Sequence, residues 1–232
     1  MAETTQLKII ARMESEFPGK FGIPRQSGLV EGLKSTLVFE PEFRNPDALR
    51  GIEGFSHLWL IWGFHEAKKE HWSATVRPPR LGGNQRLGVF ATRSPFRPNP
   101  LGLSCVKLEG VELQTPRGPV LHLSGADLMD GTPIYDIKPY ILYADCRPEA
   151  AEGYAAKPES LKVTIPPHLR EKIPQDRLEA LTGVLSCDPR PHYQADPDRI
   201  YGMPFAGLEV KFTVEGDTLL VRDIVSFSPH AF

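Results

Sequence analysis

The sequence contains few cysteines and no long hydrophobic run, and each absence excludes a class of protein. Its longest apolar run, Leu58–Phe64, is far shorter than the roughly 20 residues of a membrane-spanning helix. Its three cysteines, Cys105, Cys146 and Cys187, form no CxxC pair and leave one thiol over in any disulfide scheme, which is typical of a reducing compartment. The N-terminal residues lack the pattern of a secretory signal. We therefore expect a soluble, cytoplasmic protein with no membrane partner.

The sequence also lacks the short motifs that mark the common enzyme classes. It contains no GxSxG, no HExxH, no Walker loop and no GxGxxG, and not even a GxG tripeptide. These absences argue against the familiar serine hydrolases, zinc proteases and dinucleotide-binding enzymes. His57 and His65 would share a strand face, but their spacing of eight residues separates them too widely for one metal ion. No metal site is expected.

One segment of the chain has no acidic residue. The chain as a whole has a formal net charge of −2, so no overall basic field attracts nucleic acid or a membrane. Between His71 and Leu108, however, Asp and Glu are missing, where their overall frequency would place about five. The basic residues of this acid-free segment are Arg77, Arg80, Arg86, Arg93, Arg97 and Lys107.

The arginines of the acid-free segment lie in loops rich in proline, glycine and asparagine, at 77–84 and 94–102. Proline fixes the loop conformation before a ligand binds, and the guanidinium group offers a planar fork of donors for phosphate or carboxylate. The pattern therefore indicates a preorganised polar site. Two other interpretations stay open: the arginines pair with acidic residues elsewhere in the fold, or the loops are tight corners without a function.

Short runs rich in Val, Ile, Leu and aromatic residues alternate with turn residues, which is typical of an antiparallel β-sandwich or barrel. Because 23 of the 232 residues are proline, long helical bundles and coiled coils are excluded. No helical segments alternate with the runs, so a doubly wound parallel sheet is not expected. The expected strands are Leu7–Ala11, Ser35–Phe39, His57–Gly63, Leu87–Thr92, Ser104–Leu113, Val120–Gly125 and Ile134–Tyr143.

The composition changes at Arg147–Pro158, a stretch that is typical of a linker. Beyond it, Gln175–Ser186 has leucines at helical spacing. The segments Gly207–Val214 and Thr218–Phe227 flank turn residues, which predicts a hairpin. We therefore expect a mainly β protein, with an antiparallel β-barrel domain at residues 1–148 and a small α+β domain at 149–232.

Three strings of the sequence are long and rich in Pro, Gly and Arg. They are RGIEGFSHLWLIWGFHE at 50–66, VRPPRLGGNQRLGVFATRSPFRPNPLGLS at 76–104 and DLMDGTPIYDIKPY at 127–140. They closely resemble the TrmO family, also called TsaA-like, YaeB or VirR. DPRPHY at 188–193 and FAGLEVKFTV at 205–214 resemble the C-terminal region of its bacterial members. The resemblance therefore extends over nearly the whole chain.

The resemblance implies an all-β barrel enzyme that depends on S-adenosylmethionine. Members of this family methylate N6 of threonylcarbamoyladenosine, the modified adenosine just 3′ of the anticodon in certain tRNAs. The resemblance also implies a homodimer whose cofactor pocket lies close to the dimer contact. The C-terminal domain would then bind or position the tRNA.

The resemblance implies functional residues at positions of this sequence that match the family motifs. The implied cofactor-binding residues are Gln26, Ser27, Gly28, His65, Glu66, Arg93, Leu103, Asp130, Gly131, Thr132 and Pro133. The candidates for tRNA phosphates, whose contacts position the substrate, are Arg77, Arg80, Arg86 and Arg97. Arg93 or Arg97 would bind the threonyl carboxylate.

The N6 nitrogen of the modified base is a poor nucleophile until its proton is removed. Asp130 and Asp136 are the candidate proton acceptors. An acidic residue in a turn is more often structural, and Asp136 would share a strand face with Lys138, so a simple ion pair is an open alternative for it.

Two other functions stay open from the residues themselves. A non-catalytic RNA-binding β-barrel would use the arginine loops without a cofactor pocket, and binding of S-adenosylmethionine distinguishes it. An enzyme acting on a small acidic substrate would use the arginines as carboxylate clamps. It would show no salt-dependent affinity for tRNA, whereas contacts to tRNA phosphates weaken steeply with salt.

Overall fold

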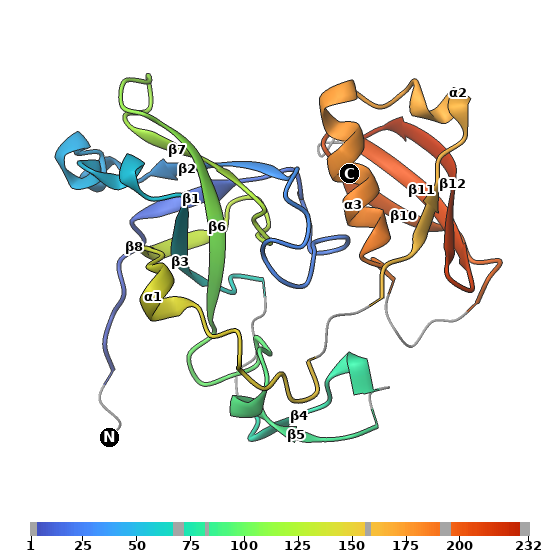
Figure 1. Ribbon diagram of the computed structural model, residues 1–232, viewed down its shortest axis with the longest axis horizontal. Coiled ribbons are helices and arrows are strands. Elements are labelled where there is room, and N and C mark those ends of the chain that lie inside the picture. The colour runs from blue at the N-terminus through green and yellow to red at the C-terminus, as the bar shows by residue number, and fades with distance from the viewer. Residues whose placement is uncertain (1–3, 67–71, 82–83, 156–158, 191–195, 228–232) are drawn as a thin grey trace.

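The chain folds into two β-sheet units that stand beside each other in Figure 1. The structure is a computed structural model and describes residues 4–66, 72–81, 84–155, 159–190 and 196–227. Strands predominate over helices in both units. The expectation of a mainly β protein is therefore confirmed.

The first unit is a closed barrel of six strands in the order β1-β2-β7-β6-β3-β8, in which neighbouring strands pair antiparallel. Its strands are β1 (Ala11–Glu14), β2 (Lys34–Phe39), β3 (His57–Gly63), β6 (Leu101–Glu112), β7 (Val120–Ser124) and β8 (Pro133–Pro139). Alternate residues face the interior, as Leu58, Leu60 and Trp62 of β3 do, because side chains of a strand point to opposite faces in turn. The predicted antiparallel barrel is confirmed.

The second unit is a four-stranded sheet in the order β10-β11-β12-β9, with β9 parallel to β12. Its elements are β9 (Lys162–Thr164), α2 (Pro167–Arg170), α3 (Leu178–Ser186), β10 (Tyr201–Phe205), β11 (Leu208–Glu215) and β12 (Thr218–Ser226). Leu181, Val184 and Leu185 form the buried stripe of α3, at the i, i+3, i+4 spacing of a helix that packs on one face. The predicted helix and the β11–β12 hairpin are confirmed.

The core of the second unit contains residues from the N-terminal part of the chain. Phe17, Val30 and Leu33, from the connection between β1 and β2, are buried in the same hydrophobic cluster as α3 and the β10–β12 strands. Phe17 packs edge-on against Phe205, with 5.6 Å between ring centroids. Residues outside 149–232 therefore complete this core and join the two units by apolar contacts.

The acid-free segment forms most of an excursion between β3 and β6. It contains a small sheet of β4 (Thr75–Val76) and β5 (Leu87–Gly88), at the bottom of Figure 1. One further short helix, α1 (Leu142–Asp145), follows the barrel. The remaining helical segments are 3₁₀ turns at Pro41–Phe43, Pro46–Leu49, Ile52–Gly54, Pro79–Leu81, Val89–Ala91 and Gln175–Arg177.

Four of the predicted strands differ from the structure by more than one residue at a boundary. The strand predicted at 104–113 begins earlier, at Leu101. Residues 7–10 precede the strand, which begins at Ala11. The strand predicted at 87–92 ends after Gly88, because the chain turns into a 3₁₀ segment at Val89. The last barrel strand ends at Pro139, and the chain then forms α1.

The sequence pattern does not predict β9 and β10. Strand β9 has only three residues, and β10 contains Gly202 and Pro204. Glycine and proline are residues that sequence patterns assign to turns and edges. Strand β10 does lie at an edge of its sheet, which is where a proline in a strand is tolerated.

Candidate active site

A cavity of about 710 Å³ opens at the end of the barrel where β3 ends and β6 begins. It is lined by the β1–β2 connection at 20–26, by the end of β3 and its exit at 62–66, by the arginine loop and the start of β6 at 93–103, and by the β7–β8 connection at 127–132. Its volume lies within the roughly 300–1,000 Å³ of small-molecule sites. The cavity is therefore large enough for a nucleoside-sized ligand.

Aromatic rings form one wall of the cavity. The rings of Trp62 and Phe64 lie 4.4 Å apart between centroids. Trp62 pairs in register with Gly102 on the neighbouring strand β6, and a Cβ added to Gly102 would lie 2.2 Å from the indole ring. The absence of a side chain at Gly102 thus provides the space that the indole occupies. Leu103, next along β6, lines the cavity and is 55% exposed.

A chain of hydrogen bonds runs from this wall to a carboxylate. The Trp62 Nε1–H donates to Ser104 Oγ at 2.9 Å, and the Ser104 hydroxyl donates to Asp127 Oδ1 at 2.5 Å. Because the indole N–H occupies a lone pair of the serine oxygen, the single hydroxyl proton is directed to the carboxylate. Asp127 lines the cavity, so the chain of bonds fixes a charged group at its wall.

Burial raises the pKa of the Asp127 carboxyl above its ordinary value, because removal from water disfavours the charged form. Hydrogen bonds from the Ser104 hydroxyl and from the backbone of Asp127 and Ser27, together with the positive charge of Arg93, act in the opposite direction. The net direction is upward. This wall of the cavity therefore holds a carboxylate that is more basic than an exposed one.

Arg93 and Gln26 lie together across the mouth of the cavity. The Arg93 guanidinium donates a hydrogen bond to Gln26 Oε1, and both residues line the cavity. Arg97 lines it as well and donates to the backbone carbonyl of Thr92 at 3.3 Å. Two guanidinium groups are thus available to an anionic part of a ligand.

The cavity brings together about half of the cofactor-binding residues that the resemblance implies. Those that line it are Gln26, His65, Glu66, Arg93, Leu103 and Thr132. Ser27 and Gly28 follow Gln26 but contribute to the fold: Ser27 Oγ accepts a hydrogen bond from the Cys105 amide, and Gly28 donates its amide proton to Gly125. Gly28 has a φ of +76°, which a residue with a side chain rarely adopts.

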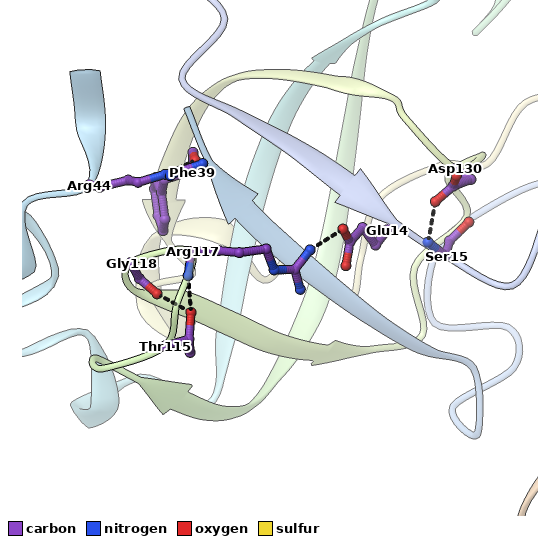
Figure 2. Close-up of polar contacts among 8 residues, drawn as sticks. All are labelled: Glu14, Ser15, Phe39, Arg44, Thr115, Arg117, Gly118 and Asp130. Carbon is purple, nitrogen blue, oxygen red and sulfur yellow. Dashed lines mark hydrogen bonds and ion pairs between the residues drawn. The ribbon is translucent and has the colours of Figure 1, made fainter. Parts of the chain in front are cut away.

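The Asp130–Pro133 turn is tied to the first strand of the barrel. Asp130 Oδ1 accepts a hydrogen bond from the Ser15 amide at 3.1 Å (Figure 2), and the Gly131 amide donates to Met13. Pro133 begins β8 and is buried. Asp130, Gly131 and Pro133 lie outside the lining of the cavity, while Thr132 lines it. These bonds hold the turn in place beside the site.

The other candidate proton acceptor, Asp136, lies on β8 outside the cavity lining. Its carboxylate accepts a salt bridge from Lys138 at 3.0 Å, and its Oδ1 accepts a hydrogen bond from the Ile137 amide. This arrangement agrees with the simple pair that the sequence left open.

The arginines considered for tRNA lie on one excursion. Arg77 is exposed, and Arg86 donates to Thr75 Oγ1 at 3.1 Å. The Arg80 side chain lies outside the part of the chain that the structure describes. Among the described residues, Arg77, Arg86, Arg93 and Arg97 form no ion pair within 4 Å. Their charge is therefore available to an anionic partner.

Sequence reasoning missed the aromatic wall and the carboxylate. Trp62, Ser104 and Asp127 come from β3, β6 and the β7–β8 connection, and no local spacing in the sequence relates them. A partial signal exists for one of them, because Asp127 opens the DLMDGTP string. Their meeting depends on the pairing of β3 with β6 and on the closure of the barrel.

The described ranges contain neither a metal-binding cluster nor a membrane-spanning helix. No group of three or more His, Cys, Asp or Glu residues there is arranged to hold a metal ion. No helix among these residues is long and apolar enough to cross a membrane. His57 contacts Ser56 and Tyr140, whereas His65 lines the cavity.

Comparison with protein families gives two matches that together span most of the chain. The profile of the tRNA-methyltransferase O N-terminal domain matches residues 12–146. The profile of the TrmO C-terminal domain matches residues 158–227. The first match contains the barrel and the cavity, and the second contains the four-stranded sheet.

Individual relatives and a solved structure agree with these matches. A tRNA (adenine(37)-N6)-methyltransferase of Escherichia coli (strain K12) is 41% identical over 198 residues, which cover 82% of this chain and 83% of that protein. A Pseudomonas aeruginosa protein whose name describes an S-adenosylmethionine-dependent methyltransferase, RcsF, is 43% identical over 216 residues, 89% of this chain and 91% of that protein. The crystal structure of TrmO from Pseudomonas aeruginosa has a TM-score of 0.79 at 35% identity and covers 97% of this chain and 99% of its own.

Proposed function

The chain belongs to the tRNA-methyltransferase O family, and on that premise we propose that its substrate is the threonylcarbamoyl form of the adenosine next to the anticodon. The protein is an S-adenosylmethionine-dependent methyltransferase that acts on N6 of an adenine in tRNA. The single observation that carries the assignment to this chain is the cavity at the end of the barrel, which lies within the matched N-terminal domain.

The cavity residues fit S-adenosylmethionine. The cavity volume of about 710 Å³ is sufficient for this molecule. Trp62 and Phe64 provide an apolar wall for its adenine ring. Arg93 offers donors to the carboxylate of the cofactor. When bound, the cofactor supplies an electrophilic methyl group. The residues of this chain bind it, orient the acceptor base and hold both in near-attack geometry, which is a large part of the rate enhancement.

The residues implied by the resemblance but outside the cavity lining support the site indirectly. The Ser27–Gly28 turn is fixed by a hydrogen bond from β6 to the Ser27 side chain and by a backbone bond from Gly28 to the end of β7. The Asp130–Pro133 turn is fixed by a backbone bond from Gly131 to β1. Their positions beside Gln26 and Thr132 keep those two residues at the cavity. We propose that these turns contribute mainly backbone groups to the cofactor site.

The tRNA is proposed to lie over the excursion that carries the arginines. Arg77 and Arg86 are exposed there, and Arg97 connects the excursion to the cavity. Arginine forks suit phosphate oxygens and the threonyl carboxylate of the modified base alike. Contacts of this kind position the substrate without reading its sequence.

A homodimer and a role of the C-terminal unit complete the proposal. Leu103 lines the cavity yet is 55% exposed, so a second copy of the chain that packs beside the cavity would cover it.

Residues 1–148 would form the catalytic domain, and residues 149–232 would form a domain that positions tRNA. We place this activity in the cytoplasm, where tRNA is modified.

One reaction tests the proposed function. The protein and S-adenosylmethionine are incubated with tRNA that bears or lacks the threonylcarbamoyl group, and the nucleosides are analysed by mass spectrometry. We expect the mass of one methyl group to be gained only on the modified nucleoside. A gain on neither tRNA would overturn the proposal. Absence of S-adenosylmethionine binding in calorimetry would favour the non-catalytic RNA-binding barrel instead.

Arg93→Ala is expected to weaken ligand binding without weakening the fold. Arg93 is exposed, and its guanidinium donates a hydrogen bond to Gln26 at the cavity. Loss of a charge-assisted hydrogen bond costs about 1.5–3 kcal/mol, so we expect the KM for modified tRNA or the Kd for S-adenosylmethionine to rise about 10- to 100-fold. The free energy of unfolding should change by less than about 0.5 kcal/mol.

Calorimetry, steady-state kinetics and urea denaturation measure these three quantities. Arg50→Ala is the matched control, because Arg50 is also exposed but pairs with Asp47 away from the cavity. A loss of unfolding free energy in Arg93→Ala as large as its loss in catalysis would assign Arg93 to the fold.

A further inference from the structure

Methylation of N6 requires a group that accepts a proton, and this inference rests on the proposed function. The N6 nitrogen of threonylcarbamoyladenosine carries one hydrogen, and its lone pair is delocalised into the urea-like carbonyl and the ring. Once the new bond to carbon forms, the nitrogen must release that hydrogen. A carboxylate or imidazole at the cavity would provide a general base.

Among the residues that the structure describes, two carboxylates line the cavity, Glu66 and Asp127. Glu66 is exposed to solvent. Asp127 is partly buried and is held by the chain of hydrogen bonds from Trp62 through Ser104. Only Asp127 is thus both at the cavity and fixed in orientation.

The two acidic residues considered from the sequence have other partners. Asp130 Oδ1 accepts from the Ser15 amide, as Figure 2 shows, and Asp136 pairs with Lys138. Neither lines the cavity. Their positions favour structural contacts, and the structure offers Asp127 in their place.

We propose that Asp127 accepts the proton of N6 during methyl transfer and that Ser104 is the residue that positions it. The bond from the sulfonium sulfur to the methyl carbon breaks, and its electron pair stays on sulfur. The N6 electron pair forms the new bond to the methyl carbon. The N6 hydrogen leaves as a proton to an Asp127 oxygen, and the carboxylate becomes neutral as the sulfonium charge disappears.

The surroundings of Asp127 suit this role. Burial raises the pKa of its carboxyl, which makes the carboxylate a stronger base than an exposed one. The charged or titratable groups that line the same cavity are Lys20, Arg25, His65, Glu66, Arg93 and Arg97. Among them the positive charge of Arg93 acts to lower the pKa of Asp127, which favours the carboxylate form.

The first test replaces the carboxylate by its amide. Asp127→Asn keeps an oxygen that accepts the Ser104 hydroxyl proton but is no longer a base. We expect the single-turnover rate on modified tRNA to fall about 100-fold or more, while the Kd for S-adenosylmethionine changes less than about threefold. A rate within about threefold of that of the wild-type protein would overturn the proposal.

The same variant separates a catalytic role from a structural one. The pKa of the folded-state carboxyl is raised, so the cost of ionising it is present at neutral pH and disappears as the pH falls below the unfolded-state value. We therefore expect Asp127→Asn to be at least as stable to urea as the unmodified protein at pH 7, with a smaller advantage at pH 4. An unstable Asp127→Asn would mean that the carboxylate serves the fold.

Ser104→Ala tests the positioning role and keeps the proposal testable whatever the stability of Asp127→Asn. Removal of the Ser104 hydroxyl takes away a hydrogen bond that lowers the pKa of Asp127. The rising limb of the pH–rate profile should therefore move to higher pH in Ser104→Ala. The rising limb should stay in place in His65→Gln, because it reports the ionisation of Asp127 and not that of His65. A limb that moves only in His65→Gln would assign the base to His65 and overturn the proposal.

A measurement without catalysis completes the test. With carboxyl-¹³C aspartate incorporated, the Asp127 resonance is identified by its loss in Asp127→Asn and titrated by NMR in the cofactor-free protein. We expect its pKa to lie above that of an ordinary aspartate and to rise further in Ser104→Ala. A pKa at or below the ordinary value would overturn the proposal. If instead the unmodified protein fails to methylate the modified tRNA, the proposed function fails, and this titration is unaffected.

Discussion

Gly102→Ala should lower the affinity for S-adenosylmethionine about 100-fold. A methyl group at this position would lie 2.2 Å from the Trp62 ring, well inside van der Waals contact. Trp62 is buried, with 9% of its surface exposed. The ring cannot swing into solvent without losing its hydrogen bond to Ser104. Overpacking of this kind costs up to about 3 kcal/mol, which corresponds to about 100-fold when it falls on the bound state.

The affinity is measured by calorimetry, and Gly110→Ala is the matched control. Gly110 lies on the same strand β6, has no positive φ, and a Cβ there would meet nothing within 4 Å. We expect the control to bind S-adenosylmethionine as tightly as the unmodified protein. Equal binding by Gly102→Ala would show that the aromatic wall is not part of the cofactor site.

Phe17→Ala should lower the free energy of unfolding by about 3–5 kcal/mol, the range for removal of a buried phenylalanine. The Phe17 side chain is 1% exposed and packs on Phe205 in the core of the C-terminal unit. Its backbone carbonyl accepts a hydrogen bond from Asp130. The substitution therefore leaves a cavity at the junction between the two units.

Urea denaturation followed by circular dichroism measures this loss, with Phe90→Ala as the control. Phe90 is 73% exposed and contacts Trp72 on the excursion, so its replacement should change the unfolding free energy by less than about 0.5 kcal/mol. If Phe17→Ala loses no more than this control, the two units do not depend on a shared core for their stability.

The fold class was predictable because alternation along a strand is a local property. In β11, apolar residues alternate with polar ones and place Val210 and Phe212 inside, and that period requires no knowledge of the neighbours. The same holds for α3, whose leucines have helical spacing. Boundaries were less accurate where the chain turned into a helical segment, as at Val89.

The acid-free segment and the long family strings were also visible in the sequence. Lack of Asp and Glu between His71 and Leu108 is a count, and it indicated an anion-binding surface before any geometry was known. The family strings then indicated which turns to expect near the cofactor. Six of the implied residues line one cavity.

The sequence by itself determined the barrel strands, the arginine loops and the family to which the chain belongs, because each is written in contiguous residues. Only the tertiary structure placed Trp62, Ser104 and Asp127 in one chain of hydrogen bonds, since strand register and barrel closure set that contact. It also decided that Phe17 completes the core of the distant C-terminal sheet. Contacts of this kind are fixed by packing between segments far apart in the chain, and local periodicity contains no information about them.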